Sequence, residues 1–130
     1  MITIQLVSED FSAQELKAFL EDQGVLNGLQ ATVERGKKEG LSGVWDSLLV
    51  EYNQLDPIQQ EIVKEVVKTT IKYALRKAKE FLDPDPHIYV QYKNGQSKKI
   101  WYEGKSDRQI VRELLAEIED GEVIKVNFKS

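Results

Sequence analysis

The sequence predicts an α+β fold in which helices cover a mixed or antiparallel sheet. Two observations carry this prediction. Short segments of apolar and β-branched residues occur near both ends of the chain, and segments whose apolar residues have helical spacing separate them. The expected order is β-α-β-α-α-β-β-α-β. A chain of 130 residues fits one domain, so residues 1–130 are expected to form a single α+β domain.

The first third of the chain predicts a strand, a helix and a weaker second strand. The segment "ITIQLV" at 2–7 is apolar and β-branched, which favours a strand. Ser12 followed by Glu15 has the spacing of a capping box, and Gly24 stands where the cap at the end of that helix is expected. The segment "LQATVERG" at 29–36 predicts the second strand.

Two helices are expected in the middle of the chain. The segment 41–54, "LSGVWDSLLVEYNQ", has apolar residues at helical spacing, namely Leu41, Val44, Trp45, Leu48, Leu49 and Tyr52. Asp56 as a cap and Pro57 at the first helical position then begin a long helix over about 57–82. Prolines 84 and 86 end it, because a residue before proline is pushed out of helical geometry.

A hairpin, a helix and a strand form a C-terminal subunit over about 87–128. Asn94-Gly95 marks the hairpin turn, and two registers are compatible with it. A two-residue type I′ turn would pair Ile88 with Trp101. A loop of three residues would pair Ile88 with Ile100, and we expect this register because it gathers apolar residues on one face. That face holds Ile88, Val90, Tyr92, Ile100 and Tyr102.

The rest of this subunit predicts one helix and one strand. The segment "SDRQIVRELLAEIEDG" favours a helix that is capped by Ser106 or Asp107 and ends near Gly121. The alternating segment "EVIKVNF" at 122–128 then predicts the final strand.

Composition limits the kinds of partner. The formal net charge of −4 argues against a generic nucleic-acid binder, although six basic and four acidic residues concentrate positive charge in 56–82. The chain has no cysteine, which excludes disulfides and thiolate metal sites. It has neither a basic secretory leader nor an apolar run near the ~20 residues that span a bilayer. We therefore expect a cytoplasmic location and no membrane partner.

The long helix carries a basic ridge, defined as Lys64, Lys68, Lys72, Arg76 and Lys79. Spacings of four, four, four and three residues place these side chains on one face. Such a ridge can be a solvated face that keeps an amphipathic helix soluble. It can also dock an acidic protein surface or a phosphate backbone. The other candidate partner-binding residues are on the hairpin face away from the core. They are Tyr89, Lys99 and Trp101, and the two aromatic residues need cover from another element or from a partner.

Catalytic chemistry has little support in the sequence. His87 is the only histidine and precedes a predicted strand. Pro84-Asp85 with Gln91-x-Lys93 resembles the PD…(D/E/Q)xK pattern of metal-dependent nucleases. One extended strand would hold Asp85 and Gln91 ~20 Å apart, however, so they could not share a metal. Glycine-rich phosphate loops and nucleophile elbows are absent. We expect neither an enzyme nor a cofactor or metal site.

The layout resembles the effector-associated constant component family, whose small members accompany protease-type effectors in bacterial conflict and signalling systems. The resemblance lies in the order of "ITIQLV", "QELKAFLED", "GLSGVWDSLLVEY", "YALRKAKEF" and "IYVQYKNGQSKKIWYEGKSDRQIVRELLAEI" over residues 1–118. It implies a non-enzymatic adaptor that connects an effector to its sensor. The expectation is therefore a protein-interaction module. The alternative is a nucleic-acid-binding module that uses the basic ridge and the aromatic–basic hairpin face.

Overall fold

The protein is described by a computed structural model, which covers residues 2–36, 46–119 and 122–129. Within these residues, six strands form one mixed sheet in the order β2-β3-β1-β6-β4-β5, and three helices accompany it. The elements are β1 (Ile2–Ser8), α1 (Ala13–Asp22), β2 (Gln30–Glu34), β3 (Ser47–Tyr52), α2 (Pro57–Glu80), β4 (His87–Tyr92), β5 (Ser97–Trp101), α3 (Asp107–Glu119) and β6 (Val123–Lys129). The predicted α+β class, with a mixed sheet and one long helix, is confirmed.

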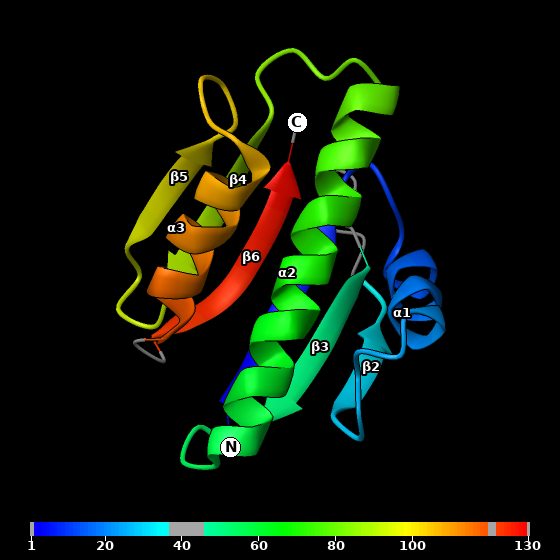
Figure 1. The fold of residues 1–130 in the computed structure, drawn as a ribbon, viewed down its shortest axis with the longest axis vertical. Coiled ribbons are helices and arrows are strands. Elements are labelled where there is room, and N and C mark those ends of the chain that lie inside the picture. Colours follow the sequence, from blue (N-terminus) through cyan, green and yellow to red (C-terminus); the bar gives the residue numbers. More distant parts are fainter. Residues whose placement is uncertain (1, 37–45, 120–121, 130) are drawn as a thin grey trace.

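All three helices lie on the same face of the sheet, and α2 runs along its middle (Figure 1). The sheet is built around the parallel pair of β1 and β6, in which Leu6 faces Val126. Its other neighbouring strands are antiparallel. Alternate residues of the strands point toward the helices and form one core with them. Leu6, Leu48, Ile88 and Val126, for example, are at most 1 % exposed.

The predicted helix over 41–54 is wrong where the structure describes it, because Ser47–Tyr52 is strand β3. Residues 41–45 lie outside the described part of the chain. Leu48, Val50 and Tyr52 alternate toward the core, and β3 pairs with β1 on one side and β2 on the other. A short apolar run is compatible with both the helical period of about 3.6 residues and the strand period of about 2. The hydrogen bonds offered by two neighbouring strands therefore decide its conformation.

The predicted caps of the helices are confirmed. Ser12 Oγ accepts a hydrogen bond from the Glu15 amide at 3.0 Å, and Asp56 Oδ1 accepts one from the Ile58 amide at 2.9 Å. Ser106 Oγ accepts from the Gln109 amide at 3.2 Å, so Ser106 rather than Asp107 caps α3. These side chains satisfy amide groups that have no partner inside the first turn.

The three-residue hairpin loop is also confirmed. Ile88 faces Ile100, and Val90 faces Lys98. The amide of Tyr92 donates to the carbonyl of Gln96 at 3.0 Å, which leaves residues 93–95 as the loop, and Gly95 has a φ of +86°. This register sends the apolar residues of the hairpin under α3 and leaves Trp101 on the opposite face.

Candidate functional site

The face of the sheet opposite the helices carries the hairpin residues that the sequence singled out. None of the described helices covers this face. We define the open-face cluster as the aromatic and basic side chains that β4, β5 and β6 direct to it, which are His87, Tyr89, Lys99, Trp101 and Lys125. The strands alternate strictly here, so the neighbours Ile88, Val90, Ile100 and Val126 are buried on the helix side.

Trp101 is the centre of this cluster. Its indole lies 4.8 Å from the ring of His87, with 46° between the ring planes, and the Nζ of Lys99 lies 5.5 Å from the indole centroid. Trp101 remains 44 % exposed, whereas His87 is 8 % exposed and hydrogen-bonds the Asp85 carbonyl through Nδ1 at 2.8 Å. The buried His87 ring therefore supports one side of the indole, and the other side of the indole is exposed to solvent.

The open face is divided by charge. In the half formed by β4, β5 and β6, the described charged side chains that point outward are Lys99 and Lys125. Tyr89 lies between Lys99 and Asn127 in one cross-strand row. The β2–β3 half instead presents Glu34 and Glu51 with polar neighbours. An aromatic and basic area thus adjoins an acidic one on the same sheet.

The basic ridge of α2 does not form one surface. Residues four apart on a helix are offset by about 40°, so the row winds around the axis. Lys68 and Lys72 face α3, whereas the guanidinium of Arg76 lies toward α1, 5.6 Å from the Phe19 ring and 5.2 Å from the Tyr73 ring. Lys79 borders a second hollow, near Leu82 and Tyr102.

The first member of the ridge is already paired. Lys64 Nζ lies 3.0 Å from Glu119 Oε1 and 3.4 Å from Glu61 Oε1. The hydrogen bond to Glu119 is the main reason that the pKa of this ammonium is raised. Lys64 therefore links α2 to α3. Because its charge is already balanced by two glutamates, it is less available to a partner than Lys68 and Lys72 are.

The ridge and the open-face cluster lie on opposite sides of the sheet. The ridge belongs to the helix layer, whereas Tyr89, Lys99 and Trp101 project from the sheet face opposite the described helices. The structure therefore brings the three hairpin residues together but separates them from the five ridge residues. A binding module that uses both sets on one continuous surface is not possible in this fold.

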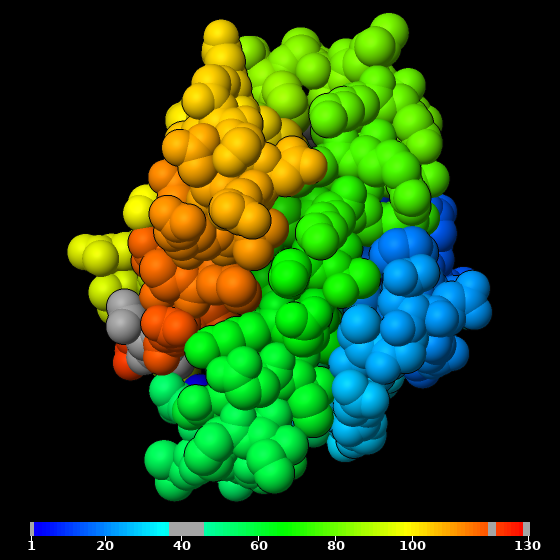
Figure 2. All heavy atoms as spheres, in the orientation of Figure 1, coloured from blue at the N-terminus to red at the C-terminus, as the bar shows by residue number. Residues whose placement is uncertain are grey.

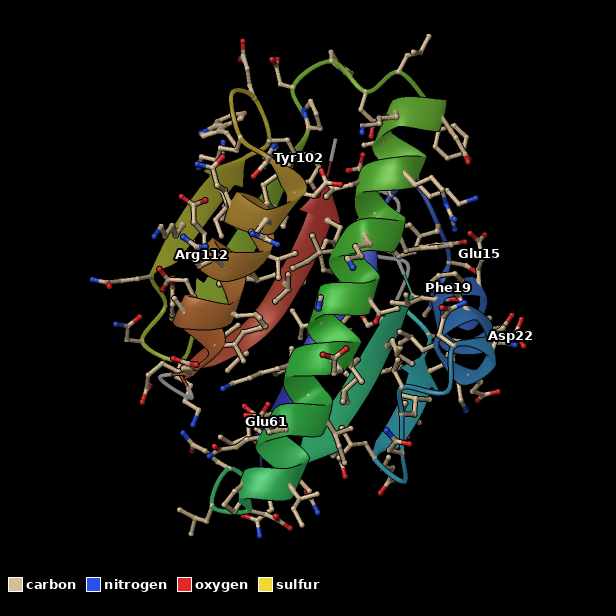
Figure 3. The ribbon with its side chains drawn as sticks, viewed as in Figure 1. Glu15, Phe19, Asp22, Glu61, Tyr102 and Arg112 are labelled. Atoms are coloured by element: carbon tan, nitrogen blue, oxygen red, sulfur yellow. The ribbon has the colours of Figure 1, made fainter. Side chains whose placement is uncertain are left out.

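Two arginines that the sequence reasoning missed join part of the ridge. Arg108 and Arg112 of α3 line a hollow of about 640 Å³ together with Lys68 and Lys72. We call this hollow the α2–α3 groove, and it follows the line where the side chains of α3 (orange) meet those of α2 (green) in Figure 2. Arg112 is labelled on α3 in Figure 3. Arg108 and Arg112 are four residues apart, and this spacing was the sequence signal that could have placed them on one face of the helix.

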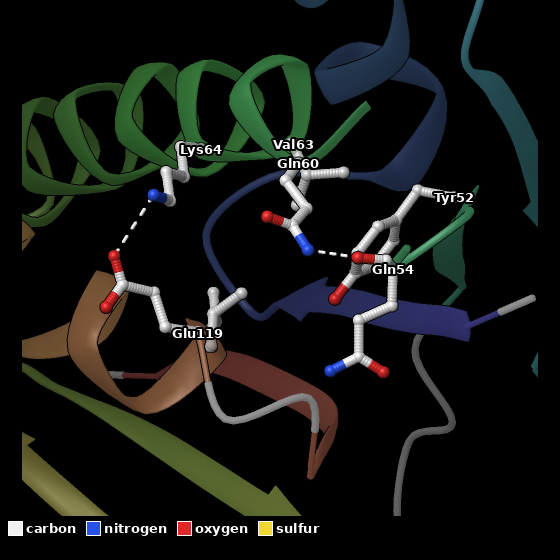
Figure 4. A pocket seen from close by; sticks show the side chains of 7 residues that line it. Tyr52, Gln54, Gln60, Val63, Lys64 and Glu119 are labelled. Carbon is white, nitrogen blue, oxygen red and sulfur yellow. Dashed lines mark hydrogen bonds and ion pairs between the residues drawn. The ribbon is translucent and has the colours of Figure 1, made fainter. Parts of the chain in front are cut away.

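A smaller pocket of about 260 Å³ lies at the lower end of α2 (Figure 4). It is lined by Tyr52, Gln54, Gln60, Val63, Lys64, Ile118 and Glu119. Lys64 and Glu119 pair across its opening, and the side-chain amide of Gln60 donates to the Gln54 carbonyl. Burial raises the pKa of Tyr52. The pocket's two charged groups neutralise each other, so neither is available as an unpaired anchor for a ligand.

A carboxyl pair connects the turn after β1 to the end of α2. Burial, followed by a hydrogen bond with Asp83, raises the pKa of Asp10 to about 7. The buried Oδ2 of Asp83 meets no hydrogen-bond donor among the described residues. A proton on Asp10 provides a donor to the Asp83 carboxyl group. Burial also raises the pKa of the nearby Tyr102. The described residues contain no group of three or more histidines and acids that could hold a metal ion.

Neither protein-family models, curated proteins nor solved structures match the chain. The resemblance to the effector-associated constant component family therefore stays a prediction. Among the described helices, none is both long enough and apolar enough to cross a membrane.

Proposed function

We propose that the chain is a non-enzymatic protein-interaction module that docks a partner protein on the open-face cluster. The observation that carries the proposal is Trp101, an indole that is 44 % exposed on a sheet face that no described helix covers. Tryptophan and tyrosine are among the side chains that most often dominate the binding energy of protein interfaces, and polar side chains form the rim around them. Lys99 beside Trp101, with Lys125 farther along the same face, favours an acidic surface on that partner.

The predicted pathway belongs to the same proposal. The order of sequence segments that resembles the effector-associated constant component family supports an adaptor between an effector and its sensor in a bacterial conflict or signalling system. Such an adaptor works in the cytoplasm and contributes no catalytic residue. The partner is then the effector or the sensor protein, and Trp101 is the residue on which its binding depends most.

A second candidate function is binding of single-stranded nucleic acid on the same face. The specific observation in its favour is the contact of the exposed Trp101 ring with His87, with Lys99 beside the indole. Exposed aromatic rings on an open sheet can stack bases, while lysines contact the phosphates. The net charge of −4 and the acids Glu34 and Glu51 on the adjoining half favour the protein partner instead.

One experiment separates the two functions. The protein and its Trp101→Ala variant are each tested for a complex with the product of a neighbouring gene, and for binding to heparin and to single-stranded DNA at increasing salt. Phe81→Ala is the matched control, because Phe81 is 57 % exposed at the end of α2. A complex that withstands salt and is lost only in Trp101→Ala supports the protein partner. DNA binding with a steep salt dependence supports the second function.

A further inference from the structure

The line between α2 and α3 is hollow along much of its length. The α2–α3 groove of about 640 Å³ is continued by a second hollow of about 480 Å³, and Asp107 borders both. The basic residues along this line extend from Lys64 to Lys79 on α2, which is about 22 Å at 1.5 Å per residue. The two hollows together therefore have the length of a helix of about 15 residues.

Four cations in the groove have no acidic partner among the described residues. Lys68, Lys72, Arg108 and Arg112 make no ion pair with any residue that the structure describes. Other lysines of the helix layer do: Lys77 lies 3.5 Å from Glu15, and Lys105 lies 2.8 Å from Glu113. Positive charge in the groove is therefore available to a ligand in a layer whose other cations are mostly neutralised.

The floor of the groove is apolar. Val111 is 9 % exposed and Leu115 is half-buried, and both come from the α3 face that meets α2. Leu82, which is 85 % exposed, borders the second hollow at the upper end of the same line. Apolar contacts thus lie along the middle of the groove, and cations lie along its edges.

We propose that the α2–α3 groove binds an acidic amphipathic helix from a protein partner. An amphipathic helix placed in a groove inserts apolar side chains at intervals of three and four residues and keeps its polar side chains at the edge. Acidic side chains at that edge meet Lys68, Lys72, Arg108 and Arg112. This surface is separate from the open-face cluster, so the groove can bind its helix whether or not the proposed function is correct.

The charges of the groove favour a peptide over a nucleic acid. Glu61, Glu65, Asp107 and Glu119 also border it, so five basic residues face four acids. A phosphate backbone, which is negative at every step, would approach these acids closely. A peptide helix can place neutral or basic residues against the acids of the groove and its own acidic residues only against the cations. The apolar floor also offers nothing to a phosphate backbone.

The test uses a labelled peptide of about 16 residues in which glutamates and leucines repeat at helical spacing. Its fluorescence anisotropy is measured with the full chain and with three variants. Lys68→Glu combined with Arg112→Glu reverses the net charge of the groove lining from positive to negative. Lys17→Glu combined with Lys93→Glu makes the same change of net charge elsewhere. Trp101→Ala leaves the groove intact. Thermal unfolding of each variant shows that it is folded.

We expect the groove variant to raise the Kd about tenfold or more, while the charge-matched control and Trp101→Ala stay within about twofold of the natural chain. A peptide with glutamine in place of glutamate should bind at least about tenfold more weakly. Equal weakening by the charge-matched control would overturn the proposal, because binding would then follow net charge alone. Tight binding of single-stranded DNA that is lost in the groove variant would assign the groove to nucleic acid instead.

Discussion

The ring of His87 packs 4.8 Å from the indole of Trp101 on the sheet face that no described helix covers. His87 is nearly buried and Trp101 is nearly half exposed, so the pair joins a fixed support to an accessible aromatic surface. The two residues are directly opposite each other on β4 and β5. Cross-strand aromatic pairs contribute roughly 0.2–1 kcal/mol to a sheet, which is much less than a large core side chain contributes.

The two faces of β5 should therefore respond differently to truncation. Trp101→Ala is expected to lower the free energy of unfolding by about 1 kcal/mol or less. Ile100→Ala, at a residue 1 % exposed on the helix side, should lower it by about 2–5 kcal/mol. Urea unfolding of the two variants beside the natural chain measures both values. A loss of several kcal/mol in Trp101→Ala would mean that the chain itself covers the indole.

The contact between α1 and α2 depends on a buried hydroxyl. Tyr73 donates a hydrogen bond to Glu15, which also lies 3.5 Å from Lys77 Nζ, and the Tyr73 ring is 4.4 Å from that of Phe19. Glu15 and Phe19 are labelled on α1 beside α2 in Figure 3. Burial, with the bond to Glu15, raises the pKa of Tyr73 to about 12.

Tyr73→Phe removes this hydroxyl and keeps the ring contacts. We expect it to lower the free energy of unfolding by about 1 kcal/mol, because the hydrogen bond is lost and Glu15 keeps Lys77 as a partner. The same substitution at Tyr89, which is on the sheet face opposite the described helices, is the control and should have almost no effect. Denaturant unfolding near pH 7 measures the difference. Equal effects of the two variants would contradict a specific role for the Glu15 contact.

The Asp10–Asp83 pair gives the protein a pH-dependent contribution to stability. The pKa of Asp10 is raised from 3.8 to about 7 in the folded chain, so between these values the folded state holds a proton that the unfolded state has released. The contribution is complete below about pH 4 and is lost as pH rises to about 7. Glu9 and Asp83 are the nearby acids that oppose ionisation.

Asp10→Asn should remove this dependence, because its amide can donate to Asp83 at every pH. We expect the variant to gain stability relative to the natural chain as pH rises from 4 to 7, with no further gain above pH 7. Asp22→Asn, at an exposed carboxyl near the end of α1, is the control. Urea unfolding at several pH values measures the difference. A difference that does not change with pH would show that the two carboxyls share no proton.

Local sequence signals predicted most of the elements but not the way they meet. Caps, prolines and Asn94-Gly95 act within a few residues, so the helix starts and the hairpin register followed from them. The strand at 47–52 did not, because its partners β1 and β2 come from other parts of the chain. The sequence also did not predict that Lys68 and Arg112 line the same groove, because the periodicity of each helix says nothing about which helix lies beside it.

The glycine in the hairpin loop tests the register on which the open-face cluster depends. Gly95 has a φ of +86°, and a Cβ placed there would meet no heavy atom within 4 Å. A substitution is therefore opposed only by backbone conformation, which a side chain disfavours at positive φ. We expect Gly95→Ala to lower the free energy of unfolding by about 1 kcal/mol and Gly95→Asn to lower it less, since asparagine tolerates this region better.

The loop variants also bear on Trp101. A slip of one residue in the hairpin would exchange the faces of β5, placing Trp101 toward α3 and Ile100 in solvent. The native loop opposes this exchange, so Gly95→Ala should raise the accessibility of the β4–β5 amides to hydrogen exchange before it affects β1 and β3. Asn94→Ala is the comparison at a neighbouring position. It removes the 2.9 Å bond from the Gln96 amide and the 3.3 Å bond that the Asn94 side-chain amide donates to Gln96 Oε1. Uniform exchange across the whole sheet in Gly95→Ala would mean that the loop does not hold the register on its own.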